Sequence, residues 1–444
     1  MLKIALLAPA GAMHRYSGNF GKSLHYAPLT LTTLAALIPE DVEHEVVIYD
    51  ETAGKIPLDI DADLIGITCI TGTAPRCYAY ADYFRKKGIV VAMGGVHPSM
   101  LPEEAAQHAD VVFTGFSEQT FPQFIHDFVK GSYQKFYHQN ADYTIEGKPH
   151  PRRELLNSKR YITTKTVEAI RGCCHTCSFC AYPAAFGKPV HKRPVKEVVA
   201  EIEALNTKHV LFPDVNLITD RAYALELFNA LIPLKIIWLG LVTSSVGIDD
   251  EIMTVFRKSG CKGLLIGFES ITQESQQYIH KGVNKVNSYV SLMERLHDNG
   301  ILVQGCFAFG GDEEDESVFD RTVEMIIKAK IDLPRYSILT PFPQTQYYAQ
   351  LEKEGRIIER NWAMYDVQHC VFRPKQMTKE QLEEGTDRAW RATYKTSNIM
   401  KRLAPFTNSP WLSVPINLGY KKYAKEWNKF TREVMCDNSD IPVL

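Results

Sequence analysis

Residues 171–180 read Arg-Gly-Cys-Cys-His-Thr-Cys-Ser-Phe-Cys and place Cys173, Cys177 and Cys180 at the spacing C-x3-C-x2-C. Thiolates grouped in one loop are typical ligands of iron–sulfur clusters and of zinc. Three of them can hold a cube of four irons and four sulfides and leave one iron without a protein ligand. The loop directly follows a predicted strand, Val167–Arg171, which opens a strand–helix series. We therefore predict an open-site iron–sulfur centre at the carboxyl ends of parallel strands.

Two other metal sites use similar spacings. The last three cysteines of the stretch also form C-x2-C-x2-C, as in bacterial ferredoxins, but the fourth cysteine of that pattern is replaced by Ala184. Structural zinc usually takes four Cys or His ligands, and although His175 and His191 are near, no second C-x2-C or H-x3-H unit follows. The iron–sulfur interpretation is favoured, and Cys174 is expected to be a bystander.

The composition is that of an ordinary globular protein. The 444 residues carry a formal charge of −2, and 45% of them are hydrophobic, which allows two or three domains. No excess of basic residues indicates a nucleic-acid partner. No apolar run approaches the roughly 18 residues that cross a bilayer, and the N-terminal run is too short for a signal peptide. Scattered cysteines and an oxygen-sensitive cluster favour a cytoplasmic location.

Residues 1–135 alternate predicted strands with predicted helices. Such alternation indicates a doubly wound, Rossmann-like α/β sheet that binds ligands at the carboxyl ends of its strands. The predicted strands are Lys3–Ala8, Glu45–Tyr49, Leu64–Thr68, Val90–Met93 and Val111–Thr114. The predicted helices are Leu29–Ile38, Arg76–Lys87 and Pro102–His108. The loops at the ligand-binding edge are 9–28, 68–75, 94–98 and 115–120.

A linker is predicted at 136–158, and a second strand–helix series at 159–355. Its six strand–helix units predict a partial (β/α)6 barrel with an active site at the strand ends. The predicted strands are Val167–Arg171, His209–Phe212, Ile236–Val242, Gly263–Phe268, Val303–Phe309 and Arg335–Leu339. Residues 356–444 are predicted to form a helical extension. Its tryptophans either shape the barrel mouth or anchor a small core, and no amphipathic basic face for membrane docking is evident there.

Along nearly its whole length, the chain resembles the cobalamin-binding radical S-adenosylmethionine (SAM) enzymes. The cysteine motif, Gly94-Gly-Val-His-Pro98 and Gly115-Phe-Ser-Glu118 carry this resemblance. Trp362-Ala-Met-Tyr-Asp366 and Phe372-Arg-Pro-Lys-Gln-Met377 point to the branch that includes hopanoid methylases. The resemblance implies a cobalamin-binding domain at 1–135, a radical SAM barrel at 159–355 and a C-terminal helical extension.

In this family the three cysteines hold a [4Fe–4S] cluster whose open iron binds SAM. The resemblance implies SAM contacts at the strand ends of the barrel, at Asp214, Asn216, Thr243, Ser245, Glu269, Gly310 and Gly311. It implies cobalamin contacts in the N-terminal domain, at Thr68, Thr71, Gly94, Gly95, His97 and Glu118. From the residues alone, Asp214 and Glu269 could instead be solvated strand-end acids, and His97 a satisfied loop histidine.

The chain departs from the family pattern at three places. It lacks the string Asp-x-His-x-x-Gly, so cobalamin is expected to bind without a histidine ligand to cobalt, and His97 is a candidate for the corrin's edge or tail. The usual Pro-Phe-Pro-Gly-Thr has Gln344 in place of glycine, which puts a close backbone approach in doubt. Gly115-Phe-Ser-Glu118 has one carboxylate where two are usual.

The resemblance implies a methyltransferase that acts on an unactivated carbon of a small-molecule or lipid substrate. A 5′-deoxyadenosyl radical would remove the substrate hydrogen, cobalamin would deliver the methyl group, and flavodoxin or ferredoxin would supply electrons. Radical rearrangement or cyclisation without methyl transfer stays open, as does a cobalamin- or metal-binding sensor that is not an enzyme. A methylthiotransferase is disfavoured, because its second cluster needs three further cysteines and only Cys69 and Cys77 precede the motif.

Overall fold

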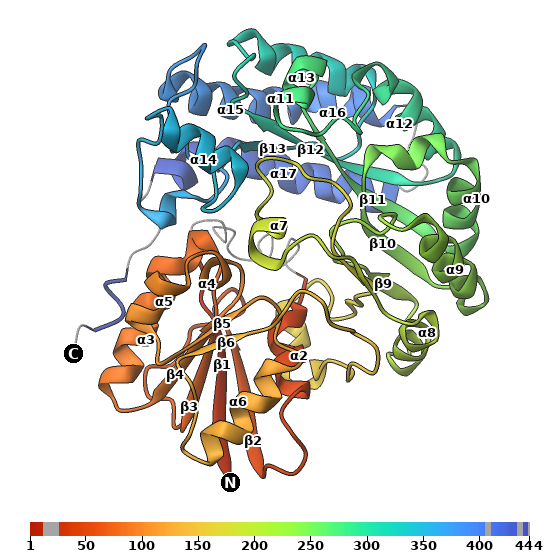
Figure 1. Ribbon diagram of the computed structural model, residues 1–444. Helices are drawn as coiled ribbons and strands as arrows, with labels where there is room; N and C mark the ends of the chain where they lie inside the picture. The colour runs from red at the N-terminus through yellow and green to blue at the C-terminus, as the bar shows by residue number, and fades with distance from the viewer. Residues whose placement is uncertain (12–25, 405–409, 433–437, 443–444) are drawn as a thin grey trace.

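The computed structural model describes residues 1–11, 26–404, 410–432 and 438–442, without the side chains at 411 and 426–432. Most of the loop predicted at 9–28, and the side chains of Trp411 and Trp427, lie outside this description. Two parallel sheets with their helices form the lower and upper halves of the molecule in Figure 1, and the short helix α7 (Ala181–Phe186) lies between them. The predicted α/β architecture with two sheet domains and C-terminal helices is confirmed.

The N-terminal sheet is parallel throughout, in the order β2-β1-β3-β4-β5-β6. Alternate residues of β1 face two separate cores: Ala5 and Leu7 belong to one, and Ile4 and Leu6 to the other. Strands that are apolar on both faces need helices on both faces. The strands are β1 (Leu2–Ala8), β2 (His44–Asp50), β3 (Leu64–Thr68), β4 (Val90–Gly94), β5 (Val111–Thr114) and β6 (Phe136–His138). The helices are α2 (Leu29–Ala36), α3 (Ala74–Lys86), α4 (Val96–Met100), α5 (Pro102–His108) and α6 (Thr120–Val129).

The stretch 136–158, which we expected to be a linker, begins with strand β6. This strand pairs in parallel with β5, from Val112 opposite Phe136 to Thr114 opposite His138. It gives no periodic signal in the sequence because it is a three-residue edge strand that buries only Tyr137. The sheet of the N-terminal domain therefore extends three residues past the boundary that the sequence predicts.

The second sheet is also parallel, in the order β13-β12-β11-β10-β9. Its strands are β9 (His209–Leu211), β10 (Ile237–Val242), β11 (Cys261–Glu269), β12 (Leu302–Phe309) and β13 (Arg335–Ile338). The first predicted barrel strand contributes a single parallel bridge, Thr166 to Leu211. Beyond it, Oδ1 of Asp214 accepts hydrogen bonds from the amides of Ala169 and Ile170, at 2.8 and 2.5 Å. The Asp214 side chain thus takes the place of further pairing between this segment and β9. The segment's last residues form β7 (Ile170–Arg171), which pairs with β8 (His191–Lys192).

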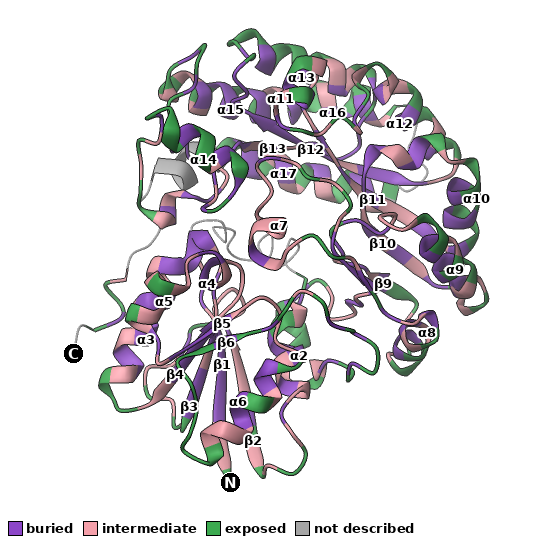
Figure 2. Cartoon of the chain, viewed as in Figure 1, coloured by how far each residue is buried: buried purple, intermediate pink, exposed green. Residues whose placement is uncertain are grey.

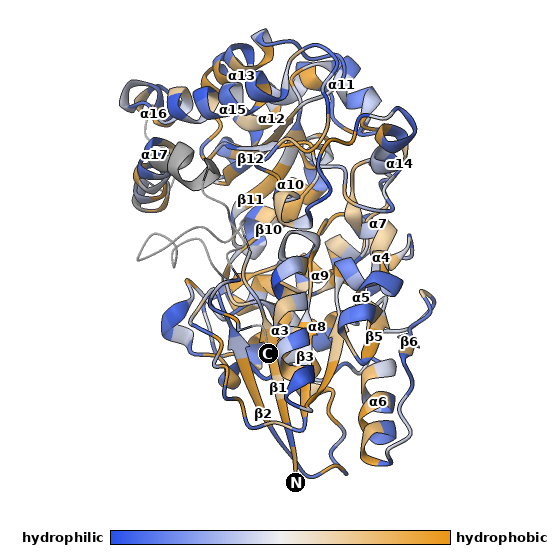
Figure 3. Cartoon of the chain, turned by 90° about the vertical axis from the view of Figure 1, so that its left-hand side faces the viewer, coloured by the Kyte–Doolittle hydropathy of each residue, from blue (hydrophilic) through white to orange (hydrophobic). Residues whose placement is uncertain are grey.

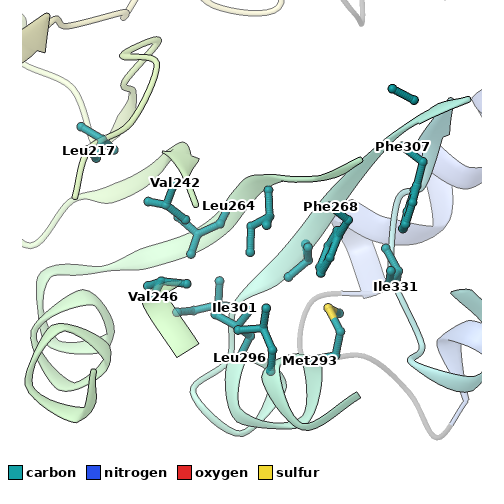
Figure 4. Packing of buried hydrophobic residues seen from close by; sticks show 14 of the residues in the cluster. Leu217, Val242, Val246, Leu264, Phe268, Met293, Leu296, Ile301, Phe307 and Ile331 are labelled. Atoms are coloured by element: carbon teal, nitrogen blue, oxygen red, sulfur yellow. The ribbon is translucent and has the colours of Figure 1, made fainter. Parts of the chain in front are cut away.

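Helices on the outer side of the second sheet close the barrel core. Leu264 and Phe268 of β11 pack against Met293 and Leu296 of α12 (Figure 4). Buried and half-buried residues alternate along β10 and β11 (Figure 2), as expected of strands that helices cover on one face. The outer helices are α8 (Val195–Ala204), α9 (Arg221–Leu231), α10 (Asp250–Ser259), α11 (Gln273–Tyr278), α12 (Tyr289–Asp298) and α13 (Ser317–Lys328).

The C-terminal helices share the core of the barrel. They are α14 (Gln346–Lys353), α15 (Lys379–Thr393), α16 (Thr396–Leu403) and α17 (Pro410–Arg432). Trp390 of α15 is buried edge-on to Tyr336 of β13, with ring centroids 5.4 Å apart, and also contacts Tyr423 of α17. This tryptophan anchors a core. Trp362 reaches the N-terminal domain instead, where its indole N–H donates to Glu104 at 2.8 Å. Among the described residues, no helix has the length and hydropathy needed to span a bilayer.

Candidate active site

The cysteine loop connects β7 to α7. Cys173, Cys177 and Cys180 are half-buried, whereas Cys174 is exposed and its amide donates to Thr219 Oγ1 at 2.8 Å. Cys180 immediately precedes the first turn of α7, and its amide donates to the Cys177 carbonyl at 3.1 Å. The loop therefore separates the three motif cysteines from Cys174, as the sequence predicts for a bystander.

The three thiols influence one another electrostatically. Burial raises the pKa of Cys177 to about 11. The positive charge of Lys281 lowers this pKa, and the nearby acidic groups of Cys180, Glu269 and Cys173 raise it further. Thiols in this setting ionise when a bound metal centre stabilises the thiolates. Among the described residues, no three Cys, His, Asp or Glu side chains lie close enough to hold one metal ion.

Asp214 and Asn216 follow β9 and lie against the cysteine loop. The Nδ2 atom of Asn216 lies 3.8 Å from the Cys173 sulfur. Oδ2 of Asp214 is buried and has no hydrogen-bond partner among the described residues. Burial raises the pKa of Asp214 to about 7, and the neighbouring Glu168 adds to the shift. A buried acceptor that lacks a donor, beside the cluster loop, fits the ammonium of SAM.

Glu269 ends β11 in a left-handed conformation with φ of +59°, at a bulge in the pairing with β12. Its carboxylate forms a buried ion pair with Lys281, and a side chain at Gly267 would collide with both groups. Burial disfavours the ammonium, but Glu269 and Cys177 outweigh this effect and keep the Lys281 pKa above its usual value. Lys281 could not be identified as a site residue from its position in the chain, because no spacing rule links it to a strand-end acid twelve residues earlier.

The remaining predicted SAM residues also follow strands of the barrel. The hydroxyls of Thr243 and Ser245, after β10, lie 2.8 Å apart. The amides of Gly310 and Gly311, after β12, both donate to Glu314 Oε2, at 3.0 and 3.1 Å. Because parallel strands end at one edge, all seven predicted SAM residues lie at the same edge of the sheet. Their contacts with SAM stay a prediction.

A cavity of about 320 Å³ opens at the carboxyl ends of β3, β4 and β5, beneath α2. Four of the residues predicted to bind cobalamin line it: Thr68, Gly94, Gly95 and Glu118. Gly95 has φ of +112°, and a Cβ there would lie 2.6 Å from the Cys69 carbonyl oxygen, so no larger residue fits. Packing against the Cys69 backbone therefore requires glycine at this position of the cavity lining.

Thr71 and His97 do not line this cavity. His97 is fully buried; its Nε2 lies 3.0 Å from the Tyr78 hydroxyl and 3.3 Å from Glu104, and its Nδ1 lies 3.4 Å from Thr71 Oγ1. The ring of Trp362 packs edge-on to it, with centroids 5.5 Å apart. These contacts favour a histidine that joins the N-terminal domain to the C-terminal extension. A cobalamin contact for either residue remains a prediction.

Four charged side chains at the rim of the cavity form what we call the rim ion cluster: Glu118, Lys148, Glu168 and Arg171. The Arg171 guanidinium pairs with Glu118 at 2.5 Å and with Glu168 at 2.8 Å, and lies 4.4 Å from the centroid of Phe116. Lys148 pairs with Glu168 at 2.5 Å. Burial would lower the Arg171 pKa, but Glu168 and Glu118 raise it well above its usual value. The cluster thus joins the N-terminal domain to the strand that carries the cysteine loop.

The grouping of these four charged side chains was not predicted from the sequence. Arg171 and Glu168 lie three residues apart beside the motif, but Glu118 and Lys148 come from distant segments. Oε2 of Glu118 is buried without a hydrogen-bond partner among the described residues. A group with amide donors, such as the side chains of a corrin ring, would satisfy it. The cavity and this carboxylate fit cobalamin.

The sequence matches two family models. The Radical SAM superfamily model covers residues 167–326, and the B12 binding domain model covers residues 24–125. Bacteriochlorophyllide d C-12(1)-methyltransferase of Chlorobaculum tepidum is 32% identical over 85% of this chain and 84% of its own length. The chain belongs to the cobalamin-dependent radical SAM methyltransferase family. Its cofactors are a [4Fe–4S] cluster, SAM and cobalamin.

Other members of the family differ in their substrates. Bacteriochlorophyllide d C-8(2)-methyltransferase of the same organism is 30% identical over 78% of this chain and 80% of its own length. The hopanoid C-2 methylase of Rhodopseudomonas palustris is 21% identical over 78% and 70%. The predicted family, and its branch with a hopanoid methylase, are confirmed.

Solved structures share the fold. The radical SAM methyltransferase TsrM from Kitasatospora setae, with cobalamin and a [4Fe–4S] cluster bound, has a TM-score of 0.67 at 15% identity and covers 96% of this chain and 100% of its own. OxsB with aqua-cobalamin and SAM bound has a TM-score of 0.68 at 14% identity and covers 98% and 80%. The arrangement of a cobalamin-type sheet and a partial barrel in one chain is therefore that of this family.

Proposed function

We propose that this enzyme transfers a methyl group to an unactivated carbon of an apolar small-molecule substrate. The observation that carries the proposal is the position of α7. Its first turn follows Cys180, and its last residue, Phe186, lines the cobalamin cavity. Six residues thus connect a ligand of the cluster to the wall of the cavity, so both cofactors would face one space between the two sheets (Figure 1).

Aromatic packing seals this junction. The rings of Phe116 and Phe186 stack with centroids 4.4 Å apart, and the Arg171 guanidinium lies over Phe116. When bound, the cluster supplies the electron that cleaves SAM, and cobalamin carries the methyl group. The protein's own contribution would be to position the two groups and to exclude water from the space between them. Asp214 and Glu118 would each give a ligand group a buried carboxylate oxygen to bind.

The names of the relatives support a small-molecule or lipid substrate. Two are named for methyl transfer to bacteriochlorophyllide d, and one for hopanoid methylation. We further propose that the enzyme works in a reducing cytoplasm and receives electrons from a flavodoxin or a ferredoxin. An oxygen-sensitive cluster and the scattered cysteines of the chain support this location.

Anaerobic turnover with deuteromethyl-labelled SAM tests the methyl transfer. A tetrapyrrole such as a bacteriochlorophyllide and a hopanoid would be supplied as candidate substrates, and products would be followed by mass spectrometry. We expect a deuteromethylated product, together with S-adenosylhomocysteine and 5′-deoxyadenosine. The variant Cys177→Ala should form none of them, and the matched control Cys174→Ala should form all three. Substrate-dependent 5′-deoxyadenosine without S-adenosylhomocysteine would contradict methyl transfer and indicate rearrangement or cyclisation.

A further inference from the structure

A groove of about 660 Å³ between α15 and α17 carries an excess of positive charge. Five cations and one acid line it: Arg388, Arg391, Lys395, Lys421, Lys425 and Asp387. The acid is already paired with Arg391 at 2.6 Å. Lys395 and Lys425 make no side-chain hydrogen bond or ion pair within the described part of the chain. Arg388 lies 3.7 Å from Asp320, so the uncompensated charge of the groove comes from its lysines, although the whole chain carries a charge of only −2.

The outer face of α17 continues this surface with apolar side chains. Val414 and Leu418 are 41% and 56% exposed. Residues spaced by four and three positions lie on one helix face, so these two align with Lys421 and Lys425. The opposite face is buried, with Tyr420 packed against Trp390 at a ring distance of 5.8 Å. The helix is thus amphipathic, and its outer face is apolar at the start and cationic further along.

Side-chain hydrogen bonds hold these helices in place. Arg402 of α16 donates to the Asn417 side chain on α17 at 2.8 Å and to the Ile331 carbonyl at 2.9 Å. The Lys421 ammonium donates to Thr396 of α16 at 2.7 Å. Figure 3 shows α16 and α17 together at the outer edge of the upper domain. The surface is therefore preformed and borne by the barrel domain.

We name this surface the C-terminal basic face: the five groove cations together with Val414 and Leu418. We propose that it docks the enzyme on a membrane rich in anionic phospholipid. Lysine and arginine side chains attract the negative surface of such a membrane, and adjoining exposed apolar side chains insert at its interface. Nucleic acid would match the cations alone and would leave the apolar half of α17 unused. The proposal concerns location and is independent of methyl transfer.

In the sequence alone, no amphipathic basic face is evident in this region. The cations come from α15, from the residue that precedes α16, and from α17, so no single segment carries a basic stripe. Only the packing of the three helices brings them to one groove.

Vesicle co-sedimentation of the full-length holoenzyme tests the proposal. We expect binding to phosphatidylcholine vesicles that contain about 30% phosphatidylglycerol, little binding to pure phosphatidylcholine, and weakening by salt. Lys421→Glu/Lys425→Glu should weaken binding at least about tenfold, and Leu418→Asp should weaken it with the cations intact. The matched control Lys196→Glu/Lys258→Glu makes the same change in net charge on exposed surfaces of α8 and α10 and should bind as the wild type does.

Circular dichroism and cofactor content would confirm that each variant is folded. Equal losses in the control and the basic-face variant would overturn the proposal, because charge alone would then explain the binding. The proposal would also be overturned if the wild-type enzyme did not bind anionic vesicles. The same holds if it bound RNA through Lys421 and Lys425 and bound no vesicles.

Discussion

Replacing Arg171 with methionine should break the junction between the two sheet domains. The methionine keeps most of the apolar stem and removes the charge that pairs with Glu118 and Glu168. Glu168 would keep its ion pair with Lys148, whereas Glu118 forms no second ion pair among the described residues and would keep only the longer-range attraction of Lys148. Removing one partner of a buried ion pair costs about 3–5 kcal/mol. That is a large share of the roughly 5–15 kcal/mol by which proteins of this kind are stable.

Urea unfolding of the apoprotein, followed by tryptophan fluorescence, measures this loss. Arg356→Met is the matched control: Arg356 is also buried, pairs with Asp312 and Glu354, and lies over the Phe372 ring. Because Asp312 keeps Lys375, we expect the control to lose only about 1–2 kcal/mol.

A second substitution separates charge from packing. Arg171→Met/Glu118→Gln removes the uncompensated carboxylate and should recover part of the lost stability, since a buried pair replaced as a whole costs little. Titration with hydroxocobalamin should show weaker binding for Arg171→Met than for Arg356→Met. The reasoning is refuted if Arg171→Met unfolds like the wild type, or if the double variant is less stable than the single one.

Three further predictions concern pH, packing and cobalt. The pKa of Asp214 is raised from 3.8 to about 7 in the folded protein. Between about pH 4 and pH 7, therefore, the folded state holds a proton that the unfolded state has lost, and the free energy of unfolding falls as the pH rises. Asp214→Asn should abolish this dependence of the unfolding free energy on pH and should stabilise the apoprotein at pH 8 by about 3–4 kcal/mol. Urea unfolding at several pH values measures both effects, and an unchanged pH dependence in the variant would contradict the prediction. Gly385→Ala should lower the free energy of unfolding by about 1–3 kcal/mol despite the better helix propensity of alanine, because the new Cβ would overlap the Phe319 ring. The control Gly54→Ala has open space around it and should be nearly neutral in thermal unfolding. Equal effects of the two substitutions would refute the argument. His97→Gln should leave the EPR spectrum of bound cob(II)alamin unchanged, because both ring nitrogens already face polar groups; loss of a nitrogen splitting would show that His97 ligates cobalt.

The sequence predicted the sheets well because their strands are short apolar runs between turns. Leu64–Thr68 and Val111–Thr114 have the predicted bounds, and the barrel strands differ from the prediction by at most two residues at either end, apart from the first. The lack of strand pairing along the first predicted barrel strand could not be anticipated. The Asp214 carboxylate accepts hydrogen bonds from two of its amides, which would otherwise pair with a neighbouring strand. Strand β6 was missed because a three-residue edge strand leaves no periodicity.

The site was predictable where one loop carries it and obscure where distant segments meet. The cysteine motif needs no tertiary information, since its three predicted ligands lie within eight residues. The Glu269–Lys281 pair and the Arg171–Glu118 pair depend on how loops of different strands converge, which no spacing rule encodes. Gln344 shows the same limit: it replaces a glycine, yet takes φ of +62°, the left-handed conformation that glycine favours.

The most direct test of the account is the yield of 5′-deoxyadenosine from the reduced enzyme under anaerobic conditions, with and without cobalamin. We predict that the protein purified with cobalamin retains it, cleaves SAM after reduction, and loses this activity when Cys173, Cys177 or Cys180 is replaced by alanine. Cys174→Ala should remain active. Protein that holds neither iron nor cobalamin after anaerobic reconstitution, or SAM cleavage that survives loss of the three cysteines, would contradict the central claim that one chain joins a radical SAM site to a cobalamin cavity.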